Sequence, residues 1–140
     1  MQTDHVVTTW KKNMLFHTTN PAGELYIETS PEHGGEGTGL RPKALMLSSL
    51  TGCSALDVAS LMKKMKLDVA DFNIDIKAEL TDEHPRYYHK VYMVFNFYGS
   101  ALNEAKLQKA VDLSIEKYCG VMAMFKKFAD VEVETVFHHQ

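Results

Sequence analysis

The chain has 140 residues, of which 45% are hydrophobic, and its 15 basic and 18 acidic side chains give a formal net charge of -3. This size and composition are typical of one domain with an ordinary apolar core, so we expect a single domain over residues 1–140. Because no cluster of basic residues occurs, the sequence argues against nucleic acid and against an anionic membrane surface as partners.

Neither a secretory signal nor a membrane span is expected. The N-terminal sequence MQTDHVVTTW lacks the basic and apolar regions of a signal peptide. We count no apolar stretch of the roughly 18 to 20 residues that a membrane-spanning helix needs. The two cysteines, Cys53 and Cys119, are too few and too far apart for a disulfide framework or paired zinc knuckles. The sequence therefore predicts a soluble, cytoplasmic protein with two thiols that are either buried or redox-active.

The first 42 residues predict three short strands and a loop. Residues 6–10, 14–18 and 24–29 are rich in β-branched and aromatic side chains and are separated by turn residues. The glycine- and proline-rich segment SPEHGGEGTGLRP, residues 30–42, predicts a mobile loop near a functional site. Its GGEGTG sequence lacks the G-K-[ST] ending of a phosphate-binding loop, so we expect neither a nucleotide nor another cofactor.

A long helix is predicted to begin at Pro42 and to run to Met65. Its first half is apolar on nearly every face, and lysines follow at its C-terminal end, where they suit the helix dipole. A helix of this kind needs protein on all sides. In a domain this small, a second subunit can supply part of that cover.

The rest of the chain predicts a hairpin, two helices and a final strand. Residues 72–80 alternate between apolar and polar side chains, and a TDEHPR turn leads to a second long strand, residues 87–99. Asn103 is the predicted N-cap of an amphipathic helix that ends at Cys119. After Gly120 come a short helix and an edge strand, so the predicted order is βββ-α-ββ-α-α-β.

Taken together, RPKALMLSSLTGCSALDVASLMKKM at residues 41–65 and NEAKLQKAVDLSIEKYCGV at residues 103–121 resemble the OsmC/Ohr superfamily, in particular its OsmC-like, YhfA-like branch. The resemblance covers nearly the full chain and places both cysteines at the family's helix positions. It implies an α+β, OsmC-like intertwined homodimer with antiparallel sheets wrapped around long central helices. It also implies a site at the subunit interface that contains both cysteines.

Well-studied members of the superfamily reduce organic hydroperoxides with a thiol, in defence against oxidative stress. By resemblance, Cys53 is the thiol that attacks the peroxide and Cys119 is the thiol that resolves the sulfenic acid. A thiol peroxidase needs a cation near its thiolate, and the family uses an N-terminal arginine oriented by a glutamate. This sequence has Lys43 at the glutamate position and no arginine in residues 1–40. The candidate cations are therefore Lys43, Arg41, Lys11 and Lys12.

Asp57 follows Cys53 by one helical turn and is predicted to line the same site. An unpaired carboxylate there would raise the pKa of the thiol, so we expect it to pair with a lysine or to cap backbone groups across the subunit interface rather than to catalyse. The histidines His84, His89, His138 and His139 show no metal-ligand spacing, and we expect no metal site.

Two functional hypotheses follow. In the first, the protein is a peroxidase that reduces a small hydroperoxide and is recycled by an external dithiol. In the second, it is a non-peroxidase dimer that binds a small apolar ligand at its interface, and its cysteines are structural or redox-sensing. A positive charge within hydrogen-bond reach of the Cys53 sulfur favours the first hypothesis, whereas purely apolar surroundings favour the second.

Overall fold

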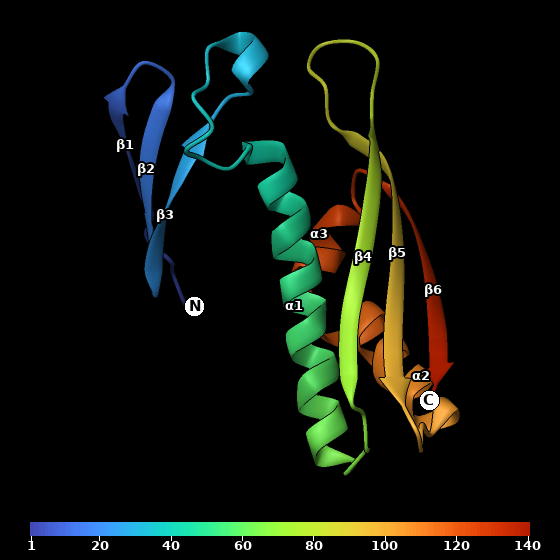
Figure 1. Cartoon of the computed structure of the whole chain (residues 1–140). Coiled ribbons are helices and arrows are strands. Elements are labelled where there is room, and N and C mark those ends of the chain that lie inside the picture. The colour runs from blue at the N-terminus through green and yellow to red at the C-terminus, as the bar shows by residue number, and fades with distance from the viewer. The chain divides into compact units, whose positions relative to one another are not determined.

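The computed structural model describes residues 1–140, which divide into two compact units, Met1–Met46 and Leu47–Gln140 (Figure 1). The order of elements predicted from the sequence is confirmed, whereas the single domain stays a prediction. The first unit contains β1 (Val7–Lys12), β2 (Leu15–Asn20), β3 (Gly23–Glu28) and a short 3₁₀ turn, Pro31–His33. Helix α1 (Pro42–Lys64) begins in the first unit and continues into the second. The second unit adds β4 (Asp71–Leu80), β5 (Tyr88–Gly99), α2 (Glu104–Leu113), a π-helical turn (Ser114–Tyr118), α3 (Gly120–Phe125) and β6 (Asp130–His139).

The first unit is an antiparallel meander in the order β1-β2-β3. Asn13, at the turn between β1 and β2, has a φ of 48°, a left-handed conformation that asparagine tolerates better than most residues. The indole N–H of Trp10 donates to the carbonyl oxygen of Asn13 at 2.8 Å and fastens this turn.

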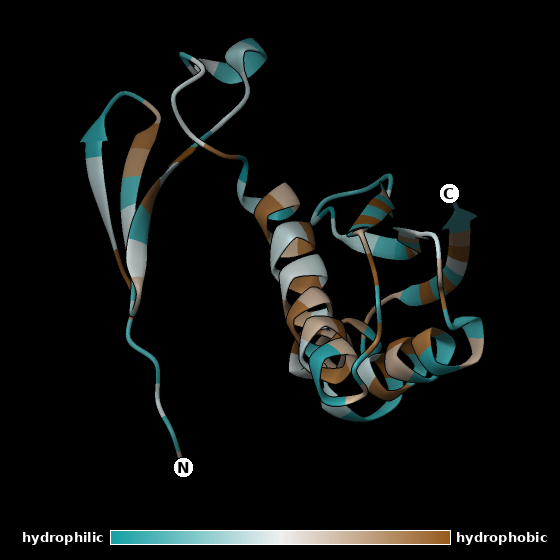
Figure 2. Cartoon of the chain, turned by 60° about the horizontal axis from the view of Figure 1, so that its bottom comes forward, coloured by the Kyte–Doolittle hydropathy of each residue, from teal (hydrophilic) through white to brown (hydrophobic).

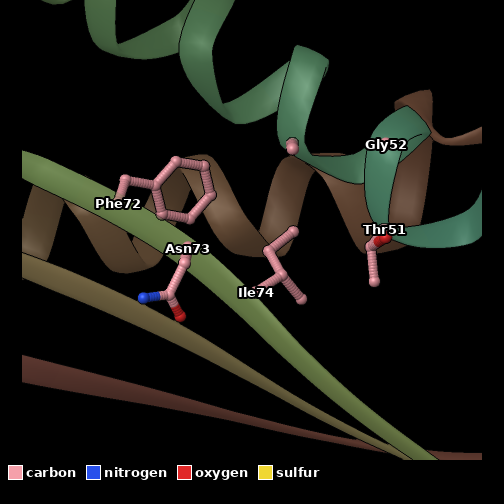
Figure 3. Close-up of a pocket in the computed structure, with 6 residues that line it drawn as sticks. Thr51, Gly52, Phe72, Asn73 and Ile74 are labelled. Atoms are coloured by element: carbon pink, nitrogen blue, oxygen red, sulfur yellow. The ribbon is translucent and has the colours of Figure 1, made fainter. Parts of the chain in front are cut away.

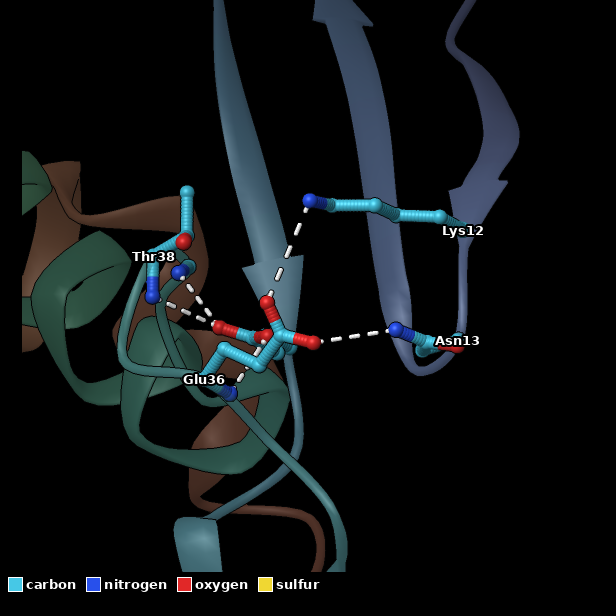
Figure 4. A network of polar contacts seen from close by, with 6 residues as sticks. Lys12, Asn13, Glu36 and Thr38 are labelled. Carbon is cyan, nitrogen blue, oxygen red and sulfur yellow. Dashed lines mark hydrogen bonds and ion pairs between the residues drawn. The ribbon is translucent and has the colours of Figure 1, made fainter.

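The loop after β3, which the sequence predicts to be mobile, is held by the buried carboxylate of Glu28 (Figure 4). Backbone N–H groups of Glu36, Thr38 and Gly39 donate to this carboxylate at 2.8, 2.7 and 2.9 Å. A side chain at Gly39 would come within 2.8 Å of the β3 backbone, so the loop requires glycine at this point. The loop also carries Glu36, which contacts Lys12 and Asn13.

The same hydrogen bonds make this loop sensitive to acid. The backbone N–H groups of Glu36, Gly39 and Thr38, with a smaller contribution from Lys12, hold the pKa of Glu28 below its ordinary value. Because the pKa of this carboxyl group is lower in the folded protein than in the unfolded chain, the ionised group stabilises the fold at a pH above its unfolded-state pKa. That stability is lost as the pH falls toward the pKa of the same group in the folded protein.

We therefore expect the amides of Glu36, Thr38 and Gly39 to lose protection from hydrogen exchange in mild acid before the amides of β5 do. The Glu28→Gln variant should exchange faster at neutral pH and should show less acid dependence, because it retains an acceptor but has no charge to lose. Exchange monitored by mass spectrometry over a pH series checks this. Equal exchange in wild type and variant would contradict it.

Helix α1 follows the predicted span closely, but within the single chain only one stripe of it is buried. Leu50, Ser54 and Val58, spaced four residues apart, face the core. Leu56 is 74% exposed, and apolar residues recur along the helix (Figure 2).

The helix is long and apolar enough to cross a membrane by length and composition, so the expectation that no stretch reaches that length is wrong. The core helix of a soluble protein passes the same test.

The second sheet has the order β4-β5-β6 and is mixed. Strands β4 and β5 form the predicted antiparallel hairpin, but β6 lies parallel to β5. This corrects the expectation of purely antiparallel sheets. Its cause is the connection: α2, the π-helical turn and α3 carry the chain back to the start of β5, as a parallel pair requires. The prediction of β6 as an edge strand is confirmed.

The core of the second unit is built on one face of the central strand β5. Its alternating residues Val91, Met93, Phe95 and Phe97 are buried. Phe97 stacks on Phe72 of β4 with ring centroids 4.8 Å apart. Residues from all three helices complete the cluster: Leu50, Val58, Leu107, Val111, Cys119, Met122 and Phe125. One of the two cysteines is therefore part of the core.

Candidate functional site

Helix α1 places three polar or nucleophilic side chains within little more than one turn: Cys53, Ser54 and Asp57. Ser54 is fully buried, whereas Cys53 is partly exposed. Since a regular helix repeats every 3.6 residues, Cys53 and Asp57 lie on the same side of α1. The predicted proximity of these two residues is confirmed.

The second cysteine follows an irregular turn. At the end of α2 the chain widens into a π-helical turn, in which the N–H of Cys119 donates to the carbonyl oxygen of Ser114 at 2.8 Å. Cys119 then caps α3, because its sulfur accepts a hydrogen bond from the N–H of Met122 at 3.3 Å. The sequence predicts the end of a helix at Cys119, but not the extra residue in this turn.

The fold brings Cys53, Asp57 and Cys119 together. The two sulfur atoms and a carboxylate oxygen of Asp57 all lie within 4.8 Å of one another. Cys119 is only 4% exposed, so Cys53 is the more accessible thiol. The structure thus unites the two cysteines expected to share a site, although they are far apart in sequence.

Two serines that the sequence analysis did not single out connect these groups. The hydroxyl of Ser54 donates to the Cys119 sulfur at 3.2 Å. The hydroxyl of Ser114 donates to Oδ2 of Asp57 at 3.0 Å, and the carbonyl oxygen of Ser54 is a more distant acceptor at 3.4 Å. Within the single chain Asp57 therefore pairs with a hydroxyl, and the expected partner across the subunit interface stays a prediction. The only sequence signal was the position of Ser54 beside Cys53.

The buried thiol is not activated by its surroundings. Burial raises the pKa of Cys119, and the neighbouring Cys53 raises it further, although the hydrogen bonds from Ser54 and Met122 act in the opposite direction. Because the pKa of this thiol is higher in the folded protein than in the unfolded chain, the unfolded chain loses its thiol proton first as the pH rises. The folded state therefore loses stability between these two pKa values. Near neutral pH, Cys119 is a protonated thiol.

We expect iodoacetamide to modify Cys53 well before Cys119 near neutral pH, because Cys119 is both buried and protonated. Alkylation of Cys119 should appear only as the pH rises above the ordinary thiol pKa. Peptide mass spectrometry after timed quenching measures both rates. Ser54→Ala serves as the matched variant. It removes the hydroxyl that donates to the Cys119 sulfur, so the alkylation of Cys119 should be slower still at a given pH. Equal rates for the two cysteines in the wild type would contradict the assignment.

The candidate cations are distant from these thiols in the sequence. Arg41, Lys43, Lys11 and Lys12 all belong to the first unit, and Lys43 precedes Cys53 by almost three turns of α1. Within the second unit, no hydrogen bond places a lysine or arginine side chain on either sulfur. Lys64 lines a pocket of about 230 Å³ together with Asp57 and Tyr118. It is the basic side chain that borders the site within this unit.

A second pocket, of about 190 Å³, lies between α1 and β4 (Figure 3). Two of the residues that line it immediately precede Cys53 in the sequence. Thr51 and Gly52 form its helical wall, and Phe72 and Ile74 project from β4 toward the helix. A Cβ atom added at Gly52 would have no neighbour within 4 Å, so this wall is open. The pocket offers a small ligand both apolar side chains and the polar groups of Thr51 and Asn73.

Known proteins resemble this chain in sequence and in fold. The model of the family described as OsmC-like protein matches residues 35–134. Protein YhfA of Escherichia coli (strain K12) is 37% identical over 90 residues, which are 64% of this chain and 67% of the relative. The crystal structure of a hypothetical protein from Aquifex aeolicus VF5 aligns with a TM-score of 0.89 at 28% identity and covers 100% of this chain and 99% of its own.

A third comparison concerns an organic hydroperoxide resistance protein OsmC from Legionella pneumophila. Its crystal structure aligns with a TM-score of 0.70 at 17% identity and covers 96% of this chain and 97% of its own. At this identity the likeness concerns the fold alone. The α+β architecture expected from the sequence is thereby confirmed.

Proposed function

Because the chain belongs to the OsmC-like protein family, we propose that it reduces organic hydroperoxides through Cys53 and Cys119. The observation that carries this proposal is the approach of the two sulfurs to within 4.8 Å, with one thiol accessible and the other buried. Accessibility suits Cys53 to meet the peroxide, and burial suits Cys119 to act second. The organic hydroperoxide resistance proteins of the same fold support this choice.

The proposed cycle has three steps. The Cys53 thiolate attacks one peroxide oxygen, the O–O bond breaks, and an alcohol leaves after taking up a proton, which yields a sulfenic acid. The Cys119 thiol then displaces water from the sulfenic acid and forms a disulfide. An external dithiol reduces the disulfide and restores both thiols. A reducing cytoplasm is the compartment in which this cycle runs.

The proposal includes a cation that stabilises the Cys53 thiolate. Lys43 and Arg41 are the candidates, supplied by the same chain or by the partner in a homodimer. A lysine is a point charge without the forked donors of arginine, so the peroxide geometry of the family does not carry over to Lys43. We assign Asp57 a positioning role, because a carboxylate so close to both sulfurs opposes thiolate formation.

The proposed homodimer rests on α1. The exposed Leu56 side chain needs a cover, which a second copy of the same largely apolar helix can supply. The resemblance to OsmC proteins implies the same assembly. No nucleic acid and no membrane take part in the proposed function.

The carboxylate beside the thiols favours a second candidate function. In this alternative the protein binds a small apolar ligand, and the cysteines pack the core or sense oxidants slowly. The pocket lined by Phe72 and Ile74 is the surface that such a ligand would contact within one chain.

Consumption of cumene hydroperoxide with dithiothreitol as reductant tests the first candidate. We expect turnover in the wild type and only the background rate of the reductant in Cys53→Ser. Lys43→Met should slow the reaction if Lys43 stabilises the Cys53 thiolate. Lys77→Met, a change on β4, is the control. Wild-type turnover equal to the background would reject the peroxidase function and leave ligand binding.

A further inference from the structure

The donor atoms of Cys53, Asp57 and Cys119 have the spacing of a metal site. In a tetrahedral zinc site, with Zn–S of about 2.3 Å and Zn–O of about 2.0–2.2 Å, two sulfurs lie about 3.8 Å apart and a sulfur and an oxygen about 3.5 Å apart. The three atoms here all lie within 4.8 Å of one another. A contraction of about 1 Å gives the tetrahedral separations.

The ligands are already oriented by neighbouring donors. The Ser54 hydroxyl and the Met122 N–H contact the Cys119 sulfur, and the Ser114 hydroxyl contacts the Asp57 carboxylate. Hydrogen bonds of this kind fix the direction of metal ligands and account for much of the affinity of a metal site. These donors come from α1, the π-helical turn and α3.

Ligand chemistry also favours a cation. Within the second unit no ion pair involves Asp57, and a metal ion takes up sulfur as thiolate, so binding releases the thiol protons. Two thiolates and one carboxylate match the preference of zinc for sulfur ligands, whereas Mg²⁺ and Ca²⁺ require oxygen ligands. The pocket beside Asp57, lined also by Tyr118 and Lys64, gives access from solvent.

We propose that the reduced protein binds Zn²⁺ through the sulfurs of Cys53 and Cys119 and the carboxylate of Asp57, with the fourth position open. This site goes beyond the proposed peroxidase function and does not require it. It also departs from the expectation of no metal, which rested on the spacing of the histidines. Zinc binding and disulfide formation use the same two sulfurs and therefore exclude each other.

Cobalt is the probe for this site, because a Co²⁺–thiolate bond gives a charge-transfer absorption and a tetrahedral ion gives intense d–d bands. Reduced, chelator-treated full-length protein should bind one Co²⁺ per chain with both signatures, and Zn²⁺ should displace it. Loss of one thiolate in Cys119→Ser should lower the charge-transfer intensity by half. Ser114→Ala should weaken Zn²⁺ binding by about 10- to 100-fold, measured against a chromophoric chelator.

Asp57→Asn tests the third ligand. It keeps the size of the side chain and an acceptor for Ser114, so the fold should remain, as circular dichroism can verify. Binding should weaken at least as much as in Ser114→Ala, whereas Asp68→Asn, an exposed change beyond α1, should have no effect. No charge-transfer band in the wild type, or unchanged affinity in both Asp57→Asn and Cys53→Ser, would overturn the proposal. Because no peroxide is present, that failure leaves the peroxidase function untouched.

Discussion

Replacing Cys119 by serine should stop the catalytic cycle after its first step. In this variant the Cys53 sulfenic acid forms but has no second thiol within 4.8 Å to condense with. Groups held in reacting geometry have effective concentrations of about 10⁵ M or more, which no external dithiol reaches. We therefore expect turnover with dithiothreitol to fall by roughly 100-fold or more.

The trapped intermediate gives a direct measurement. Dimedone should label Cys53 in Cys119→Ser after one equivalent of hydroperoxide, and excess peroxide should carry Cys53 on to sulfinic acid. Serine is close to cysteine in size and still offers an acceptor to Ser54 and Met122, so the fold should persist. Ser60→Ala, an exposed change on α1, is the control, because it keeps both thiols and the hydrogen bonds to Cys119. Wild-type turnover in Cys119→Ser would show that Cys119 does not resolve the sulfenic acid.

The second large effect concerns assembly. Leu56 is 74% exposed on α1, and Leu56→Glu should convert the proposed dimer into a monomer. Burial of a leucine side chain contributes about 1.5–3 kcal/mol, and a two-fold interface contains this position twice. A loss of about 3–6 kcal/mol raises the dissociation constant by roughly 10² to 10⁴-fold.

Sedimentation velocity over a concentration series measures this shift. Leu80→Glu places the same charge at another exposed leucine, at the end of β4, and should leave the assembly unchanged. Circular dichroism should be equal for both variants, because Leu56 contributes little to the core of the single chain. A wild type that stays monomeric at all concentrations would contradict the proposed dimer.

Local sequence patterns predicted most of the fold. The strands in residues 71–80 and 88–99 follow from alternation and from β-branched and aromatic content, and the cap at Asn103 follows from side-chain chemistry: its Oδ1 accepts from the N–H of Lys106 at 3.1 Å. The parallel direction of β6 was missed, because an alternating pattern does not specify the direction of pairing. That direction depends on how the intervening helices cross the sheet.

The site was predicted only in part, for a similar reason. Resemblance and spacing identified Cys53, Cys119 and Asp57, but Ser54 and Ser114 contribute through contacts between α1 and the π-helical turn, which no local pattern reports. The anchoring of the loop by Glu28 was missed because its partners are backbone N–H groups of residues 36–39, which any sequence possesses.

The π-helical turn makes the thiol pair depend on chain length as well as on residue identity. A π-helical turn contains one residue more than an α-helical path between the same two ends. Deletion of one residue within Ser114–Tyr118 would restore the α-helical path and rotate everything after it by about 100° relative to α2. A homologue one residue shorter here would therefore keep both cysteines in its sequence and yet hold them apart. The proposed coupling of the two thiols therefore depends on this spacing, and deletion of a single codon should abolish it.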